Sequence, residues 1–505
     1  MKPGMPPPIE ATASAALAAQ PGTRALFFKV FPSICLPMFL ASVDQTIVAT
    51  ALPNIAGALG DVERISWVVV AYLMATTIAA PVYGRLGDVF GRKMLMFVAL
   101  GIFIGASVLC ALAPTMLALI AARVLQGAGG GGLMTLSQAL VGEIVPARER
   151  PRYQGYLAGT FMVSSTFGPV AGGWLTQHFG WMSVFLVNLP LGAIAVLLAF
   201  RLPRSPARSG RFRFDWLGTG LLALFVIALL LALERVQRLQ AGDLPLIAGL
   251  VGVAVAALWL LLKQERRAAS PLIPVKVLRD ASIWRADAMA ACVGAMLVGG
   301  ITFMPIYLQV VRGADPSMVG LLMLPLTAGV AVGALTTGRL MVRTGRTAIF
   351  PSIGQAIVAL GWIILALIGH SMPVYWLPAL FVVIALGTGS TMPVVQLTVQ
   401  VVAGPKNLGA ASASVQFTRS IGAALGTATI GAVLFAVLSA QDPQIAALFA
   451  EVVERGPQIL QGKSPALVTT LTADVIGAFR AAFLTISSFA IVAMLLAWSL
   501  PMRRL

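Results

Sequence analysis

Fourteen long apolar runs constrain the fold of this 505-residue chain more than any other feature of its sequence. A helix of about 20 apolar residues crosses a bilayer, whereas the strands of a membrane barrel are about ten residues long and alternate in polarity. Only 10% of the residues are charged, compared with about 25% in soluble domains. We therefore predict an all-α polytopic membrane protein with fourteen transmembrane helices. The predicted helices span residues 28–52, 66–86, 94–113, 115–141, 154–177, 183–202, 214–233, 244–262, 286–310, 317–340, 347–368, 373–402, 410–438 and 478–502.

The positive charge of the chain is distributed unevenly between the two sides of the predicted membrane. With the N-terminus in the cytosol, 26 of the 35 Lys and Arg residues fall in cytosolic segments, seven in outer segments and two within spans. This bias follows the positive-inside rule, and an even number of spans places both termini in the cytosol. The net charge of +17 therefore reflects membrane topology and does not predict a nucleic-acid partner. We expect a multi-pass protein of the cell membrane, here a bacterial inner membrane.

Two ten-residue stretches form an internal repeat. Residues 84–93 read GRLGDVFGRK and residues 338–347 read GRLMVRTGRT, with five identities at a constant offset of 254. Related halves with a substrate cavity between them are typical of secondary transporters. We therefore divide the chain into a cytosolic tail (1–27), a first six-helix bundle (28–202), two additional helices with cytosolic linkers (203–285) and a second six-helix bundle (286–505).

The second bundle contains a long predicted outer loop, residues 439–477. Within it, IAALFAEVV places apolar residues at helical spacing, with Glu451 and Glu454 toward the other face. This pattern predicts a short amphipathic helix that lies on the outer membrane surface or caps an exit path. A solvated loop is the other interpretation of the segment.

The first copy of the repeat carries an unusual cluster of charges. It contains Gly84, Asp88, Gly91, Arg92 and Lys93, and the position equivalent to Asp88 in the second copy is a valine. A carboxylate beside a helix N-terminus and an arginine can form a latch that biases the cytosolic side toward closure. The other interpretation is a positive-inside turn with a solvated aspartate.

Few ionisable residues lie deep in the predicted spans, where charge is costly and indicates function. They are Asp44, Arg123 and Arg419, whereas Glu143 and Asp287 lie near cytosolic span ends, where we expect solvation. Asp44 and Arg123 fall at equal predicted depth, so a pair between them is geometrically possible. A carboxylate that exchanges an arginine for a proton can couple transport to proton entry, although a permanent structural ion pair fits as well. For Arg419 we expect a structural role rather than a substrate contact.

Small residues interrupt the predicted span 154–177. Gly168, Pro169, Gly172 and Gly173 give a kinked helix with a bare face that allows close helix approach. We interpret this face as a pivot or seal between the two halves, with ordinary helix packing as the alternative.

The sequence offers little to support catalysis or metal binding. The three cysteines fall in predicted spans and the two histidines in outer loops, without neighbouring ligand or nucleophile patterns. We therefore expect a protein that is not an enzyme, needs no cofactor and takes its energy from a proton gradient.

Four ordered motifs together resemble the major facilitator superfamily, specifically its fourteen-helix drug:proton antiporters of the EmrB/QacA type. GRLGDVFGRK resembles the family's loop signature, VDQTIVATALPNI its first-helix motif, RVLQGAGGG its fourth-helix motif and GPVAGGW its fifth-helix antiporter motif. The resemblance implies export of hydrophobic compounds driven by proton entry, with Asp44 and Arg123 in proton coupling. It also implies a substrate-contacting or structural role for Gln126, as for Arg419.

The chain departs from that family at two points. Met182 and Ser183 replace an Arg and a Trp that usually follow the fifth helix, and the tenth span has no acid. The missing acid makes a dicationic substrate a weaker interpretation. Neutral, weakly basic and anionic substrates remain open.

Two other functions share parts of this pattern. A major facilitator transporter dedicated to one metabolite or lipid would have the same fold, whereas a membrane-embedded enzyme would need converging acids, histidines or metal ligands. The expected partners are a small lipophilic substrate, protons and membrane lipid. We expect a monomer, and a periplasmic adaptor with an outer-membrane channel is compatible with the class.

Overall fold

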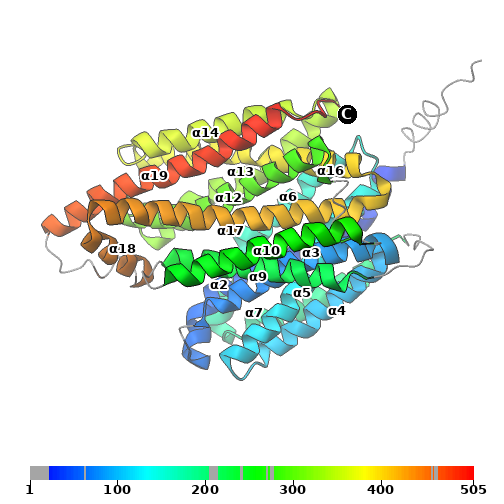
Figure 1. The fold of residues 1–505 in the computed structure, drawn as a ribbon, viewed down its shortest axis with the longest axis horizontal. Helices are drawn as coiled ribbons and strands as arrows, with labels where there is room; N and C mark the ends of the chain where they lie inside the picture. Colours follow the sequence, from blue (N-terminus) through cyan, green and yellow to red (C-terminus); the bar gives the residue numbers. More distant parts are fainter. Residues whose placement is uncertain are drawn as a thin grey trace, which may run out of the picture.

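The computed structural model describes residues 22–61, 64–203, 214–238, 243–268, 271–272, 278–455, 459 and 465–504. Long helices run side by side along the longest axis of the molecule, with α17 extending across most of it (Figure 1). In a bilayer such helices satisfy their backbone groups internally, which is why apolar runs of this length become helical. Each of the fourteen predicted runs corresponds to one helix or to consecutive helices, and no run extends beyond its helix by more than four residues.

The first half of the molecule contains α2 (Gly22–Leu59), α3 (Trp67–Phe90), α4 (Arg92–Ala111), α5 (Met116–Ile144), α6 (Arg150–Phe179), α7 (Ser183–Leu186) and α8 (Asn188–Ala199). The second half contains α12 (Ala281–Val310), α13 (Pro316–Thr344), α14 (Ile349–Ile368), η3 (Val374–Trp376), α15 (Leu377–Gly389), α16 (Thr391–Ala403), η4 (Pro405–Asn407), α17 (Leu408–Gln441), α18 (Pro443–Arg455) and α19 (Pro465–Trp498). Separate hydrophobic cores hold the interior of each half.

Twelve helices of the described residues are long and apolar enough to cross a membrane. The other two predicted spans correspond to α6 and to the α7–α8 pair. α6 is long but rich in Gly, Ser and Thr, and residues 183–199 form a shorter apolar segment.

The additional pair, α9 (Trp216–Arg238) and α10 (Leu244–Arg267), packs against the seam between the two halves. Leu222 and Val226 of α9 form a cluster with Ile78 of α3 and with Phe417 and Ile421 of α17. The pair therefore contacts one helix from each half. Most of its predicted linkers, including residues 204–213 and 273–277, lie outside the described residues.

Two predicted segment boundaries were wrong. α2 begins at Gly22, so helix extends into the predicted tail 1–27, of which residues 1–21 lie outside the description. The predicted outer loop 439–477 is largely helical, because α17 continues to Gln441, α18 follows, and α19 already starts at Pro465. The parts of these helices that lie beyond the predicted spans contain polar residues. Hydropathy therefore assigned shorter helices than the structure has.

The helix predicted in the outer segment is present, and its apolar face packs against other helices. α18 lies at the end of the molecule opposite the C-terminus (Figure 1). Ile445, Phe449 and Val452 on one face are buried, and the Phe449 ring lies 5.8 Å from Phe435 of α17 and 6.3 Å from Phe479 of α19, centroid to centroid. The apolar face is therefore covered by protein rather than by lipid.

The repeated loops lie at one end of the molecule. We call this end the basic face and define it by the helix ends around residues 84–93 and 338–347, together with Arg503 and Arg504. Gly91 and Gly345, related by the offset of 254, end α3 and α13 with φ of 92° and 67°. A residue with a Cβ is strained there. Both copies of the repeat therefore end a helix at a glycine with positive φ, although ψ is 138° at Gly91 and 4° at Gly345.

Candidate functional site

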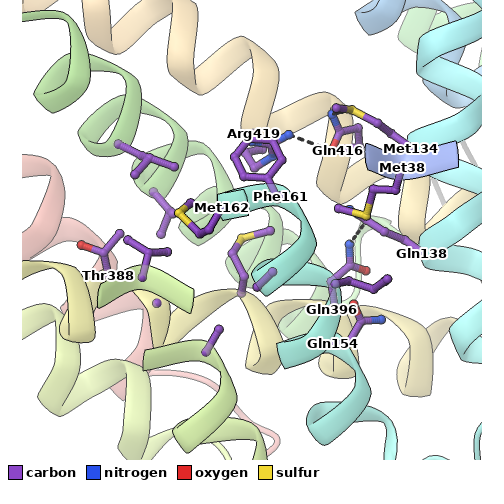
Figure 2. A pocket seen from close by; sticks show the side chains of 18 residues that line it. Met38, Met134, Gln138, Gln154, Phe161, Met162, Thr388, Gln396, Gln416 and Arg419 are labelled. Carbon is purple, nitrogen blue, oxygen red and sulfur yellow. Dashed lines mark hydrogen bonds between the residues drawn. The ribbon is translucent and has the colours of Figure 1, made fainter. Parts of the chain in front are cut away.

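A cavity lies between the two halves, with about 730 Å³ of empty space including its opening. Its lining comes from α2, α5 and α6 of the first half and from α12, α13, α15, α16 and α17 of the second. Figure 2 shows Met38, Met134, Met162 and Phe161 among the side chains that face it. Methionine side chains adapt to ligands of different shape, so these walls can accept more than one apolar body.

Glutamines close the cavity toward the basic face and join the two halves. Gln396 of α16 donates a hydrogen bond to the side-chain oxygen of Gln138 on α5, and Gln400 Nε2 donates to the Gln138 carbonyl at 3.2 Å. Gln138 and Gln396 both line the cavity and are buried. The hydrogen-bonded amides therefore form a floor made by both halves.

Arg419, for which the sequence left a structural role or a substrate contact, lines this cavity. Its Nη2 donates to Gln416 Oε1 at 3.0 Å, and its guanidinium carbon lies 5.2 Å from the centre of the Phe161 ring. Phe161 belongs to α6 and Arg419 to α17, so the cation–π contact bridges the halves. Hydropathy could not show which face of α17 meets the cavity.

Asp44 and Arg123 form an ion pair in the interior of the first half. Both side chains are at most 1% exposed. Arg123 Nε also donates to the Val68 carbonyl at 3.0 Å, and its guanidinium carbon lies 4.2 Å from the centre of the Tyr72 ring. A buried guanidinium is stable only when its charge and donors are matched, and these contacts match them.

The Asp44 carboxylate is held by further donors. Gln126 Nε2 donates to Oδ1 at 2.8 Å and Asn188 Nδ2 donates to the same oxygen at 3.0 Å, while Arg123 binds Oδ2. Gln126 also accepts from Arg123 at 2.7 Å. Both carboxylate oxygens of Asp44 are therefore held by hydrogen bonds from side chains of the same half.

Sequence reasoning missed Asn188 and Ser107. Ser107 Oγ of α4 accepts hydrogen bonds from Gln126 at 2.9 Å and from Asn188 at 3.3 Å. Asn188 begins α8 and is fully buried. Its signal was a single amide in the apolar stretch FLVNLPLG, which could have been marked as a polar group in need of buried partners.

Asp88 connects the two halves at the basic face. Its Oδ1 accepts from the backbone N–H of Gly409 at 2.8 Å and its Oδ2 from that of Ala410 at 3.0 Å. These are N–H groups in the first turn of α17, which lack intrahelical partners, and Asn407 at the N-cap makes no side-chain cap bond. An aspartate of the first half therefore caps a helix of the second half.

Arg92 extends this contact into the first half. Its Nη2 donates to Asp88 Oδ1 at 2.6 Å, and its Nη1 pairs with Glu143 at the end of α5. Lys93 Nζ donates to the carbonyls of Phe200 and Leu202 at 2.7 Å, just beyond the C-terminus of α8. The charged loop is thus built from specific hydrogen bonds and is not a solvated turn.

Close backbone contacts occur at two equivalent seams. A Cβ on Gly84 of α3 would lie 2.6 Å from the carbonyl oxygen of Gly409 on α17. A Cβ on Gly338 of α13 would lie closer still to the carbonyl oxygen of Pro151 at the start of α6. The repeated glycines therefore allow α3 to approach α17 and α13 to approach α6.

One interpretation of the sequence is that the bare face of α6 seals the two halves. In the structure this face packs against its own half. A Cβ on Gly168 would collide with Thr46, and one on Gly172 would lie 2.5 Å from the Ile47 carbonyl, so both glycines pack on α2 of the same half. Gly173 has open space around it, and Pro169 is exposed. The small residues serve packing within the first half, while Thr166 of α6 contacts Thr327 of α13 at 3.3 Å between the halves.

Asp287 is buried, not solvated as expected from its place near a span end. Its side chain is 6% exposed, and its Oδ1 accepts a hydrogen bond from Ser414 Oγ of α17 at 3.2 Å. Because α12 and α17 pack closely, the first turns of α12 are shielded from solvent. Asp287 is thus a second buried carboxylate, outside the Asp44 network.

Two helical halves around a central cavity, with buried charges among their membrane-spanning helices, define a membrane transporter rather than an enzyme. The sequence profile of the Major Facilitator Superfamily matches residues 34–427, and the chain belongs to this family.

Known proteins place the chain among transporters of several kinds. It is 35% identical over 403 residues to an uncharacterized MFS-type transporter of Mycobacterium tuberculosis (strain H37Rv), a match that covers 80% of this chain and 59% of that protein. It is 31% identical to the multidrug transporter protein MdtP of Bacillus subtilis, covering 79% of this chain and 74% of the relative. The crystal structure of the human organic anion transporter MFSD10 (TETRAN) superposes with a TM-score of 0.62 at 16% identity, covering 95% of this chain and all of that one. The last comparison shows the shared fold.

Proposed function

We propose that this protein is a proton-coupled exporter of lipophilic compounds, of the fourteen-helix drug:proton antiporter type. The observation that carries the proposal is the buried Asp44–Arg123 pair in the half that forms one wall of the cavity. An ionised carboxylate this deep is costly unless it is matched, so exchange of Arg123 for a proton gives Asp44 two stable states. Alternation between them can accompany alternation of the two halves.

The cavity supports several lipophilic substrates more than one dedicated metabolite. Its methionine and phenylalanine walls contact apolar bodies without directional bonds, and adaptable apolar walls are typical of promiscuous binders. A transporter dedicated to one metabolite or lipid is the second candidate, on the same fold. Both halves of the cavity come from one chain, which supports a monomer as the functional unit.

The membrane topology of the proposal follows from charge. The basic face carries the arginines of the repeated loops and of the C-terminus, so the positive-inside rule assigns it to the cytosol. The Asp88 cap and the glutamine floor then close the cytosolic side. The α9–α10 pair between the two halves supports the fourteen-helix type.

Transport in everted membrane vesicles tests the proposal. Respiration acidifies the vesicle lumen, and uptake of the neutral fluorescent probe N-phenyl-1-naphthylamine is followed before and after nigericin collapses the pH gradient. We expect gradient-dependent uptake that requires Asp44. Uptake that persists after nigericin, or in the Asp44→Asn variant, would contradict proton coupling.

A further inference from the structure

The charge of the cavity wall is positive. Among the eighteen described residues that line the cavity, Arg419 is the one charged side chain, and the polar remainder consists of four glutamines and Thr388. The field inside such a cavity, away from water, acts strongly on an ionised ligand.

Arg419 differs from the two buried arginines of the described residues. Arg123 pairs with Asp44, and Arg92 pairs with Asp88 and Glu143. Arg419 has no carboxylate within 4.0 Å among the described residues, and its side chain contacts an uncharged amide and an aromatic ring. The carboxylate of Asp287 accepts a hydrogen bond from Ser414 instead. Ser414 lies five residues before Arg419, which is about 7.5 Å along the axis of α17. Within the part of the chain that the structure describes, the Arg419 guanidinium therefore faces the cavity with a charge that no carboxylate balances and with N–H donors that have no acceptor.

A second donor without a partner lines the same cavity. Gln154 is 5% exposed, and its Nε2 makes no hydrogen bond within the described structure. A buried donor left unmatched costs free energy until a ligand or water accepts from it. Gln154 lies on α6 and Arg419 on α17, so the cavity offers acceptor-seeking groups from both halves (Figure 2).

We propose that the cavity selects amphiphilic organic anions: a carboxylate or similar head that binds Arg419, and an apolar body against Met38, Met134, Met162 and Phe161. The planar guanidinium presents two parallel donors that match a carboxylate. An ammonium group would meet like charge without a compensating acid, which disfavours cations. This inference names the substrate class of the proposed exporter and so rests on that proposed function.

Binding to the full-length protein in detergent tests the charge preference without requiring transport. The probes share one apolar body: 2-naphthylacetate, 2-naphthylacetamide and 2-(2-naphthyl)ethylammonium. We expect the carboxylate to bind at least about 10-fold more tightly than the amide, and the ammonium more weakly than both. Equal binding, preference for the ammonium, or absence of carboxylate binding would overturn the proposal.

Variants separate a ligand contact from a structural role. Arg419→Gln is expected to abolish the difference between carboxylate and amide binding, because it removes the charge that binds the carboxylate. Arg419→Lys is expected to retain part of the carboxylate preference. Arg64→Gln, which removes an exposed arginine outside the cavity, is the matched control. Retention of the full preference in Arg419→Gln would overturn the inference.

Charge movement in proteoliposomes distinguishes failure of this inference from failure of the proposed function. If n protons enter per substrate exported, the carboxylate cycle moves n + 1 charges, the amide cycle n and the ammonium cycle n − 1. Currents recorded with the amide therefore report proton coupling alone. Zero amide current with net amide transport overturns proton coupling, whereas faster transport of the ammonium than of the carboxylate overturns the anion preference.

Discussion

The carboxylate of Asp88 on α3 accepts a hydrogen bond from the backbone N–H of Gly409 on α17 at 2.8 Å, across 321 residues of sequence. The bond joins the two halves at the basic face, where the helices must separate if the cavity is to open on that side. Its strength comes from charge, because hydrogen bonds to ionised groups contribute about 1.5–3 kcal/mol. The contact therefore biases the closed state.

Asp88→Asn should open the basic face. Asparagine keeps one acceptor oxygen but loses the charge, which should shift the equilibrium toward the open state by about 2 kcal/mol, or roughly 30-fold. Distances between spin labels at positions 94 and 401, on exposed residues of the first and second halves near this face, should lengthen. Asp280→Asn is the matched control, because Asp280 caps its own helix α12 by accepting from Ser282 N at 2.8 Å. Equal distance distributions in the two variants would show that Asp88 only caps a helix and does not hold the basic face closed.

Gly84→Ala should open the same seam by a different route. The added methyl group would lie 2.6 Å from the Gly409 carbonyl oxygen, so α3 and α17 must move apart at a cost of about 1–3 kcal/mol. The same spin-label pair measures the separation. Gly101→Ala is the control, since a Cβ there has no atom within 4 Å. Unchanged distances in Gly84→Ala would show that the seam already accommodates a side chain.

Asp44→Asn should abolish uptake driven by a pH gradient while leaving substrate binding intact. The amide cannot carry a proton or pair with Arg123, whereas the cavity wall does not include residue 44. Uptake should fall by at least about 100-fold, by analogy with loss of a positioned proton-transfer group, in everted vesicles with equal amounts of protein. Asp287→Asn removes another buried carboxylate, on α12 of the second half, and should retain coupling. The reverse pattern would assign the proton to Asp287.

Phe449→Ala should destabilise the second half. Phe449 is 1% exposed and packs between Phe435 and Phe479, so its truncation should lower the free energy of unfolding by about 3 kcal/mol. Val453→Ala, on the exposed face of the same helix, should change it by less than about 0.5 kcal/mol. Titration with SDS in mixed micelles measures both. Similar losses in the two variants would show that α18 is not held by its apolar face.

Local patterns in the sequence determined a large part of the fold. Apolar runs are sums over neighbouring residues, so helix positions could be assigned without knowledge of packing, and each run corresponds to one helix or to consecutive helices. The offset of 254 predicted two related halves. In the structure the repeat supplies Gly91 and Gly345, which end equivalent helices with positive φ. Asp44 and Arg123 could be identified because any charge in an apolar run is conspicuous, and their equal predicted depth indicated the contact that the structure shows.

Tertiary structure decided which partner each of these residues meets. The sequence placed Asp88 beside a helix N-terminus, but that terminus belongs to α17 in the other half. It placed Asp287 near a span end, yet packing of α12 on α17 buries it. Arg419 faces the cavity, and α18 turns its apolar face to α17 and α19. Hydropathy gives the position of a helix along the chain, whereas its rotation and tilt are set by packing against other helices, and those two quantities determine which side chains reach the cavity.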